Sequence, residues 1–474
     1  MKNKGIISKN KIMNKYYFYS ITTLIIIAAL VFVGCETLKI EKFADNDSYW
    51  AKSETISVNS ALKADLKVDV AIIGGGYTGL SSAYHLAKMN PNLKIAVFEA
   101  KTLGSGASGR HGGMVLSSLL DEYSDNETFK WTYDLSVNNM KFIDSLSKAL
   151  NMNCDLVLNG YCETIFREED VAEYKDYVQQ ANKAGIPLEF WDKQKTKEKL
   201  GTDLYFGAMY DPNGGSVHAV KLIKLLKVAV ENEGVTIYEN SPVISFEEGK
   251  TINLKVKADK VEYNVEAGDI VVATNAYTSK LGIFKNKIMP VHTQVAVTEP
   301  LTQAQLDAVN WKSRLPFYDS RIMLFHLVLT PDNRIVVGGG NVDTYWNNGL
   351  EYKGNISRVA DMMLDELIIM FPELKGIKFE HVWNGILGTT FDEVATVGVM
   401  GDNKNIYYGL AYNGHGVNQS ILFGDVIAHL HSKKYHGWED TEYYGYELSK
   451  IPPEPFKFVG SNMFFKYWKW KDRH

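Results

Sequence analysis

Residues 67–79, KVDVAIIGGGYTG, decide the fold of this chain. The apolar run Lys67–Ile73 predicts a short buried strand, and the residues after the glycines have the spacing of a helix. Between strand and helix stand three glycines in the pattern G-x-G-x-x-G. In such a turn Gly74 permits the tight reversal, Gly76 lets the backbone approach a pyrophosphate, and Gly79 lets the helix pack closely on the strand. The stretch therefore predicts the opening of a dinucleotide-binding domain.

An acidic residue follows at the distance expected for ribose recognition. A second strand is predicted over Leu93–Phe98, and it is followed by Glu99, 20 residues after Gly79. A carboxylate at this position accepts hydrogen bonds from the ribose hydroxyls of NAD or FAD, and it disfavours a 2′-phosphate. Ala100, next to it, is included in the expected cofactor contacts.

A second glycine-rich loop distinguishes between these two cofactors. Residues 104–113 read GSGASGRHGG and directly follow the ribose acid. FAD extends past the first helix, so a second loop that closely approaches the cofactor favours FAD over NAD. The cofactor contacts expected from this loop are Ser108, Gly109, Arg110, His111, Gly112, Gly113 and Met114.

Composition excludes several classes of protein. The chain has 474 residues, 45% hydrophobic, which is enough for two or three domains. Its 51 basic and 56 acidic side chains give a net charge of −5, which argues against a nucleic-acid partner. Three cysteines cannot form a disulfide scaffold. The histidines do not have the spacing of a metal-ligand set, so no metal is expected.

The amino terminus has the pattern of an export signal. Five lysines precede an apolar run from about residue 16 to 33, which ends at Gly34-Cys35. We expect residues 1–35 to form a signal peptide and lipoprotein anchor, in which residues 1–34 are removed and Cys35 becomes the lipid-bearing first residue; an uncleaved membrane anchor is the competing interpretation. Both place the folded part outside the cytoplasm and attached to the membrane. Residues 36–66, polar and aperiodic, are expected to be a tether.

Several ordered segments resemble one known family. The stretches VAIIGGGYTGLSSAYHLAK, FEA and GASGRHGGM resemble the FAD-dependent D-amino-acid-oxidase-like superfamily, and specifically its gamma-glutamylputrescine oxidoreductase-like branch. Later segments that are similar to the family in the same order are DIVVATNAY (269–277), VHTQVAVTEPL (291–301), DNRIVVGGG (332–340), FPELKG (371–376), WNG (383–385) and YNGHG (412–416).

The resemblance implies an α/β fold with two interleaved domains. One is a Rossmann-like FAD domain of the glutathione-reductase type, formed by residues 67–115, 211–282 and 395–447. The other is a substrate domain on an antiparallel sheet, formed by residues 116–210 and 283–394. The remaining expected cofactor contacts are Tyr77, Thr78, Val243, Thr274, Asn275, Gly385, Asn413, Gly414, His415, Gly416 and Val417.

The carboxyl-terminal segments can also be interpreted physically. Ile406–Ala411 has the composition of a strand, and Gly414-His415-Gly416 precedes a helical pattern. A helix amino terminus stabilises negative charge, which in this family collects on the flavin. The tail, 448–474, is rich in aromatic and basic residues near its end; it either packs as a terminal helix or lies at a bilayer surface.

Four side chains are candidates for catalysis. His111 stands where the family usually has Asn. A noncovalent contact with the flavin or substrate is the favoured interpretation of His111, and a covalent histidyl link to FAD and a structural hydrogen bond are the two others. Trp383 and Tyr412 could form aromatic walls around an amine or belong to the core. His415 could lie near the flavin or cap a helix. Near Val328 the chain lacks the Arg that the family commonly has.

The expected activity is the oxidation of a C–N bond. An amine or amino acid would give hydride to flavin N5, the imine would hydrolyse, and O2 or a membrane quinone would reoxidise the flavin. Two other classes stay open at this point. One is an exported flavin-carrying binding protein without turnover, and the other is an NAD-dependent dehydrogenase, which the loop 104–113 argues against.

Overall fold

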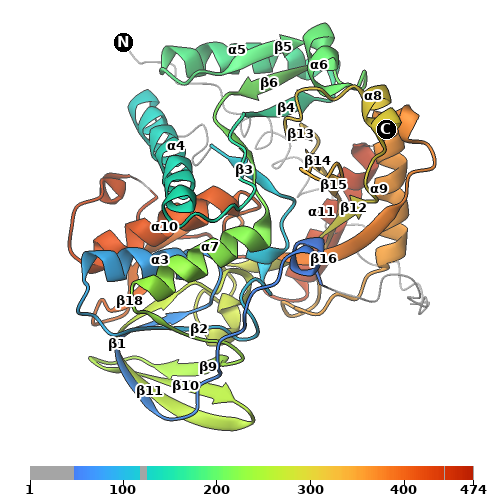
Figure 1. Ribbon diagram of the computed structural model, residues 1–474. Helices are drawn as coiled ribbons and strands as arrows, with labels where there is room; N and C mark the ends of the chain where they lie inside the picture. The colour runs from blue at the N-terminus through green and yellow to red at the C-terminus, as the bar shows by residue number, and fades with distance from the viewer. Residues whose placement is uncertain (1–46, 118–124, 442, 473–474) are drawn as a thin grey trace.

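The computed structural model describes residues 47–117, 125–441 and 443–472, and its two large sheets belong to two packed domains (Figure 1). The first sheet has the order β17-β18-β11-β1-β2-β8, with β10 and β9 continuing from β11. Its strands are β1 (Leu66–Ile73), β2 (Ile95–Phe98), β8 (Thr236–Tyr238), β9 (Val243–Glu247), β10 (Ile252–Ala258), β11 (Val261–Val272), β17 (Thr396–Met400) and β18 (Ile406–Leu410).

The centre of this sheet is parallel and buried on both faces. β1 pairs in parallel with β2 and with β11. Val70 and Ile72 pack toward the helices, whereas Ala71 and Ile73 pack against residues of β10 and β11. Burial on both faces explains why Val70–Ile73 is continuously apolar, whereas the first half of β1, with exposed Lys67 and Asp69, alternates. The helices around this sheet are α3 (Tyr77–Met89), α4 (Asn126–Ala149), α7 (Ala219–Asn232) and α10 (Gly416–His431).

The second sheet has the order β16-β12-β15-β14-β13-β4-β6-β5. All its pairings are antiparallel except that of β13 with β4. Its strands are β4 (Tyr161–Ile165), β5 (Glu189–Asp192), β6 (Gly207–Asp211), β12 (Met289–Thr298), β13 (Phe317–Asp319), β14 (Phe325–Leu329), β15 (Ile335–Asp343) and β16 (Phe379–Thr389). The helices beside it are α5 (Val171–Lys183), α6 (Lys193–Leu200), α8 (Gln303–Val309), α9 (Ile356–Met370) and α11 (Phe456–Lys471).

The chain passes between the two sheets several times. The first sheet takes strands from residues 66–98, 236–272 and 396–410, and the second takes strands from 161–211 and 289–389. A small pair, β3 (Met114–Leu116) with β7 (Gly214–Ser216), lies on these crossings. The expected fold class, a Rossmann-like domain interleaved with a domain on a largely antiparallel sheet, is confirmed.

The predicted tether is wrong for its described part. Residues 49–53 form a helix, α2 (Tyr49–Ser53), and Trp50 and Leu62 are each only 3% exposed. Ser48 caps this helix and donates its hydroxyl hydrogen to the Gly109 carbonyl at 2.6 Å. Polar composition was misleading here, because a few buried side chains are enough to hold an aperiodic segment on the protein surface.

The predicted signal and anchor, residues 1–35, lie outside the described residues. Among the helices that the structure describes, none is both long enough and apolar enough to cross a bilayer.

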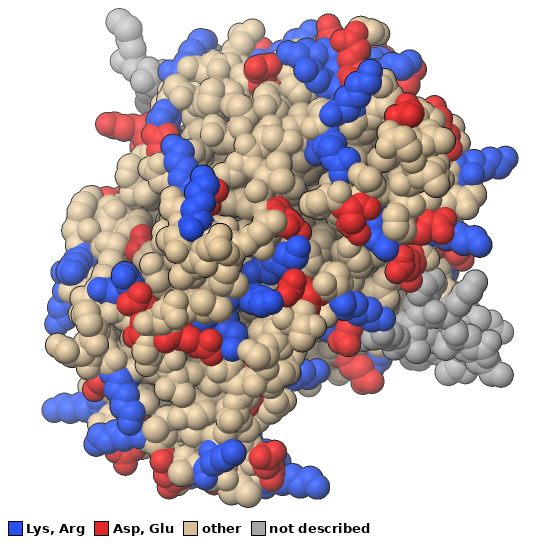
Figure 2. Space-filling model, in the orientation of Figure 1, with Lys and Arg blue, Asp and Glu red and all other residues tan. Residues whose placement is uncertain are grey.

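On the face shown in Figure 2, acidic and basic side chains are interspersed.

Residues 456–471 of the carboxyl-terminal tail form a helix, α11, that packs on the substrate domain, and contact with a bilayer surface stays a prediction. α11 lies against β15, and the Asp472 carboxylate accepts hydrogen bonds from the Met323 N–H and from Arg167, both at 2.7 Å. Its outer side chains remain accessible, with Phe456 70% and Trp470 58% exposed.

Candidate functional site

The first glycine turn has the close contacts that the motif predicts. A Cβ at Gly79 would lie 1.9 Å from the Gly74 carbonyl oxygen, so only glycine lets α3 pack at this point. Gly74 has φ of +108° and lies against Ala273, the residue after β11. A Cβ at Gly76 would lie 2.9 Å from Ser108 Oγ. The first and second glycine-rich segments are therefore in contact.

The expected ribose acid lies at the mouth of this turn. Glu99 Oε2 accepts a hydrogen bond from the Gly75 N–H, and its Oε1 accepts one from the Lys101 N–H, each at 2.9 Å. Burial raises the pKa of Glu99, although these backbone donors act in the opposite direction. Ala100 is exposed beside it. The carboxylate is thus oriented by the same loop that would hold the pyrophosphate.

The second loop joins the two domains through Arg110. Its Nε donates to the Ser105 carbonyl at 2.8 Å, and its NH1 donates to the Asn384 carbonyl of β16 at 3.1 Å. The Arg110 carbonyl in turn accepts from Trp383 Nε1 at 2.8 Å. A Cβ at Gly385 would lie 3.6 Å from Arg110 Cβ, so β16 passes directly beside the loop.

His111 lies in a chain of hydrogen bonds that uses both of its ring nitrogens. Nδ1 accepts from the Gly113 N–H at 3.0 Å, and Nε2 lies 2.9 Å from the Tyr77 hydroxyl, which donates to the Ala219 carbonyl at 2.9 Å. This chain requires the neutral tautomer with hydrogen on Nε2. The Trp50 indole donates to the His111 carbonyl at 2.7 Å.

His326, on β14, is buried against the same loop from the substrate side. A Cβ at Gly112 would lie 2.0 Å from His326 Nε2, and one at Gly338 would lie 2.4 Å from the same atom. Within the described chain this nitrogen is buried and has no hydrogen-bond partner. A polar ring atom without a partner at a domain junction marks a candidate ligand contact.

We call His111, His218 and His326 the junction histidines. Burial lowers the pKa of His111 to about 3, and it lowers those of His218 and His326 to about 4. His218 caps α7 and lies 3.0 Å through Nε2 from the Ser53 hydroxyl. All three are therefore neutral near pH 7.

Two asparagines with left-handed backbone hold the segments that follow β11 and β18. Asn275 Oδ1 accepts from the Ala411 N–H, and Asn413 Oδ1 accepts from the Thr390 N–H, both at 2.9 Å. Their φ values are 42° and 49°. Both predicted contacts thus fix the backbone after β11 and β18, and a direct contact with the cofactor stays a prediction.

The start of α10 agrees with the sequence. The helix begins at Gly416, followed by half-buried Val417, and no atom would contact a Cβ at Gly414 within 4 Å. His415 is exposed and makes no side-chain cap, so capping is not its role here. The remaining expected cofactor residues lie at or just beyond strand ends: Met114 begins β3, Val243 begins β9, and Thr274 follows β11.

Of the two interpretations of Trp383 and Tyr412, the described chain supports packing in the core over aromatic walls around an amine. Trp383 is fully buried and bonded to the Arg110 carbonyl, and Tyr412 is 6% exposed with its hydroxyl 2.5 Å from Thr78 Oγ1. Neither ring presents a face to open space. Their polar atoms found partners inside the protein, which is the usual condition for burying Trp and Tyr.

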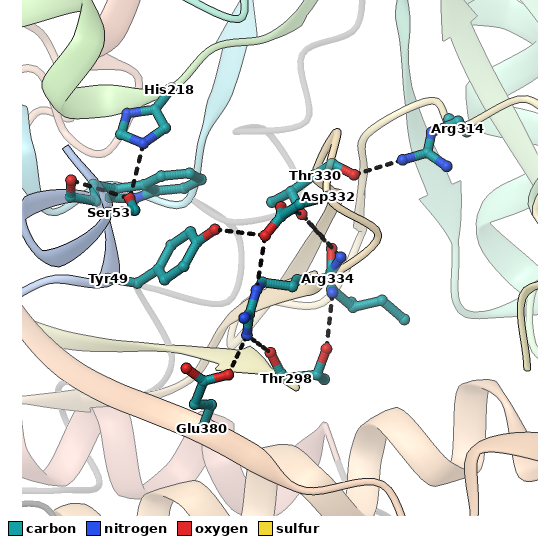
Figure 3. A network of polar contacts seen from close by, with 11 residues as sticks. Tyr49, Ser53, His218, Thr298, Arg314, Thr330, Asp332, Arg334 and Glu380 are labelled. Atoms are coloured by element: carbon teal, nitrogen blue, oxygen red, sulfur yellow. Dashed lines mark hydrogen bonds and ion pairs between the residues drawn. The ribbon is translucent and has the colours of Figure 1, made fainter. Parts of the chain in front are cut away.

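Asp332 and Arg334, in the segment DNRIVVGGG, have a structural role. Arg334 bonds the carboxylates of Asp332 and Glu380 and the Thr298 carbonyl, and the Tyr49 hydroxyl donates to Asp332 at 3.1 Å (Figure 3). This network ties α2 to the substrate sheet. Sequence reasoning missed α2 altogether, although Ser48 before an aromatic pair is a helix-start signal.

These features fit FAD. A helix amino terminus, a glycine that leaves room for a pyrophosphate, and an oriented carboxylate meet at one end of a parallel sheet, and a second loop leads from them to the other domain. The fold and the turns therefore define a two-domain dinucleotide-dependent oxidoreductase. The chain belongs to the family described as FAD dependent oxidoreductase, which matches residues 69–430.

Curated relatives agree with this family. The chain is 30% identical over 375 residues to a "Probable oxidoreductase OrdL" of Haemophilus influenzae, covering 76% of this chain and 82% of that protein. It is 28% identical over 437 residues to the gamma-glutamylputrescine oxidoreductase of Escherichia coli, covering 90% and 97%. The resemblance noted from the sequence is thereby confirmed.

Solved structures share the fold. Glycine oxidase from Geobacillus kaustophilus superposes with a TM-score of 0.67 at 20% identity, covering 78% of this chain and 96% of that one. L-proline dehydrogenase from P. horikoshii superposes with a TM-score of 0.66 at 20% identity, covering 84% and 99%.

Proposed function

We propose that this protein oxidises the C–N bond of a small amine with bound FAD. The observation that carries the proposal is the loop 104–113, which touches the dinucleotide turn at Gly76 and the substrate sheet at Gly385 and His326. A cofactor held by the first turn and led along this loop would reach the face of the substrate sheet. Relatives named for an amine or an amino acid support the reaction class.

The chain's own residues would position and shield the reactants. When bound, the flavin would accept a hydride from the carbon next to the amine nitrogen, and the resulting imine would hydrolyse in water. Arg110 holds the loop against β16, and neutral His326 supplies a ring nitrogen that has no partner in the described chain. A neutral ring can accept a hydrogen bond from the amine, whereas a charged ring would repel an ammonium group.

We infer a preference for amines over free amino acids. Three arginines of the substrate domain are already engaged: Arg314 bonds the Thr330 carbonyl, Arg321 pairs with two carboxylates, and so does Arg334. The strand that the family uses for an Arg carries Val328 here, buried in an apolar cluster. A substrate carboxylate would thus lack the usual clamp at this place.

We further infer that the flavin is held without a covalent link to His111. Both ring nitrogens of His111 are occupied by hydrogen bonds within the protein, and alkylation of either would break one of them. Mass spectrometry of the denatured protein is expected to give the unmodified chain mass. An added flavin mass that disappears in His111→Ala would contradict this inference.

The main test is an anaerobic titration of the purified protein. We expect a flavin absorption spectrum that bleaches with one class of amines and responds more slowly to the matching amino acids. Flavin that no amine reduces would instead favour an exported flavin-carrying binding protein, and protein that cannot be loaded with FAD would refute the proposal. Aerobic and quinone-supplemented assays then identify the acceptor, for which we propose O2 or a membrane quinone.

The role of His326 has a separate test. His326→Gln should keep its flavin content and lose up to about tenfold in turnover, because the hydrogen bond that positions the amine would be lost or misplaced and such a bond is worth about 0.5–1.5 kcal/mol. Lys250→Ala, on the exposed β9–β10 turn, is the matched surface control. Equal turnover in the two variants would refute the role of His326 and leave the reaction class untouched.

For the location we propose a lipid anchor at Cys35 and a domain outside the cytoplasm. The support is the lysine-rich, then apolar, amino-terminal sequence alone. Membrane fractionation with and without globomycin tests it, because accumulation of an unprocessed precursor is expected of a lipoprotein. Cys35→Ser should prevent the lipid attachment and the cleavage of the precursor. Membrane association that is insensitive to both would favour an uncleaved anchor.

A further inference from the structure

One carboxylate in the middle of α10 collects three imidazoles. Asp425 Oδ1 lies 3.2 Å from His429 Nδ1 and 3.3 Å from His85 Nδ1, and its Oδ2 lies 3.6 Å from His436 Nε2. Asp425 and His429 are one turn apart on α10, and His85 comes from the neighbouring helix α3. The ion-pair partners found for Asp425 in the described chain are these histidines, with no Lys or Arg among them.

The spacing is that of a metal-ligand set. One ligand atom each from Asp425, His429 and His436 can be chosen so that all three lie within 4.8 Å of one another. Four N and O atoms bound to zinc at about 2.0–2.2 Å in a tetrahedron lie about 3.3–3.6 Å apart. The 3.6 Å between Asp425 Oδ2 and His436 Nε2 falls in this range, so small side-chain adjustments would complete the set.

The turn after α10 is built to bring His436 back to the helix. Lys433 takes a left-handed φ of 53°, and the Lys434 N–H donates to the His429 carbonyl at 2.9 Å. Trp438, fully buried, packs against Phe423 with ring centroids 5.2 Å apart. His436 is thus positioned by the backbone and by its buried neighbour, without help from a ligand.

The three imidazole rings are fixed in place, but two of them have a ring nitrogen, on the side away from Asp425, without a hydrogen-bond partner. His85 Nε2 and His436 Nδ1 are buried and find no hydrogen-bond partner in the described chain, and the His436 side chain is only 6% exposed. His429 Nδ1 lies 3.0 Å from the Asp425 carbonyl, the second contact that commonly orients a ligating ring and leaves Nε2 for a metal. Aromatic rings of α4 surround the group, with Phe142 5.0 Å from His85.

We propose that Asp425, His429 and His436 bind one divalent transition-metal ion of the zinc class, with His85 completing or orienting the ligand set. Neutral imidazoles and a carboxylate are the ligands that such ions take, and three protein ligands with a third imidazole, His85, nearby suit tetrahedral coordination. Bound metal would join α10 to its following turn and to α3. This site is separate from the proposed C–N oxidation and does not depend on it.

Metal binding is measured directly. The purified full chain, stripped with a chelator and dialysed against Zn²⁺ near pH 7.5, is expected to keep about one zinc per chain after gel filtration. Co²⁺ as a spectroscopic probe should give the visible absorption of a tetrahedral site. Because metal that binds only the folded state stabilises it, the unfolding temperature should rise by several degrees on adding Zn²⁺.

Variants separate this site from adventitious binding. Asp425→Asn, His429→Gln and His436→Gln should each lose the zinc and the shift in unfolding temperature. The matched control is His431→Gln: this histidine also lies on α10 and also contacts a carboxylate, Asp269 at 3.3 Å, but outside the cluster. A wild type that keeps no zinc, or a His436→Gln variant that keeps as much as His431→Gln, would overturn the proposal.

Discussion

Two groups of histidines differ in what surrounds them. Each junction histidine lies in or beside the contact between the domains, and burial lowers its pKa. The outer histidines, on α3, on α10 and in the turn that follows, point at one carboxylate instead. They are His85, His429 and His436.

The difference shows that burial alone does not decide what an imidazole does. Where hydrogen-bond donors and acceptors already occupy the ring, as at His111, the histidine is a structural link between loops. Where one carboxylate is the shared neighbour of several rings, the carboxylate and the neutral rings can offer lone pairs to a cation. The following predictions test this contrast.

The largest effect is expected at His111. His111→Ala removes the acceptor of the buried Gly113 N–H and the partner of Tyr77, and it leaves a cavity at the domain contact. We expect a loss of about 2–4 kcal/mol in the free energy of unfolding. Urea unfolding of the variant is compared with that of His415→Ala, an exposed position where a change within about 0.5 kcal/mol is expected.

The next effect concerns the contact between Gly112 and His326. A methyl group at position 112 would clash with the buried ring, so Gly112→Ala should cost about 1–3 kcal/mol through overpacking. Gly106→Ala is the control in the same loop, because no atom lies within 4 Å of a Cβ there. Equal unfolding midpoints would show that the loop moves freely away from His326.

Acid should weaken the fold through the junction histidines. The folded-state pKa of His326 is about 4, below the ordinary 6.5, so the unfolded chain takes up a proton first as the pH falls. Stability from this group is complete above about pH 6.5 and is lost toward pH 4, which amounts to about 1–2 kcal/mol between pH 7 and 5. His326→Gln should therefore lose less stability over this range than wild type in urea unfolding at both pH values.

The smallest effect on stability is expected for a change among the outer histidines in metal-free protein. In chelator-treated protein, His429→Gln should cost at most about 1 kcal/mol, because the side chain is partly exposed and only its contact with Asp425 is removed. Differential scanning fluorimetry in EDTA measures this. A large loss in the absence of metal would mean that the cluster is a structural network like that of His111.

The site was predictable from sequence where a local pattern has one physical meaning. The close contact of Gly79 with Gly74 and the start of α10 at Gly416 follow from strand, glycine and helix signals a few residues apart. The roles of Trp383 and Tyr412 were not predictable, because an aromatic residue near a motif can face a ligand or the core. Only their partners, the Arg110 carbonyl and Thr78, decide between the two.

The sequence by itself determined the dinucleotide turn, the place of Glu99 after the second strand and the family, since these depend on spacing within single strand–turn–helix units. Only the tertiary structure decided that Trp50 packs near Gly113, that His326 touches Gly112, and that His436 returns to Asp425. Each of these contacts joins residues from different segments or from the two sides of a turn. Spacing along the chain does not encode such contacts, because they arise from the packing of whole helices and sheets.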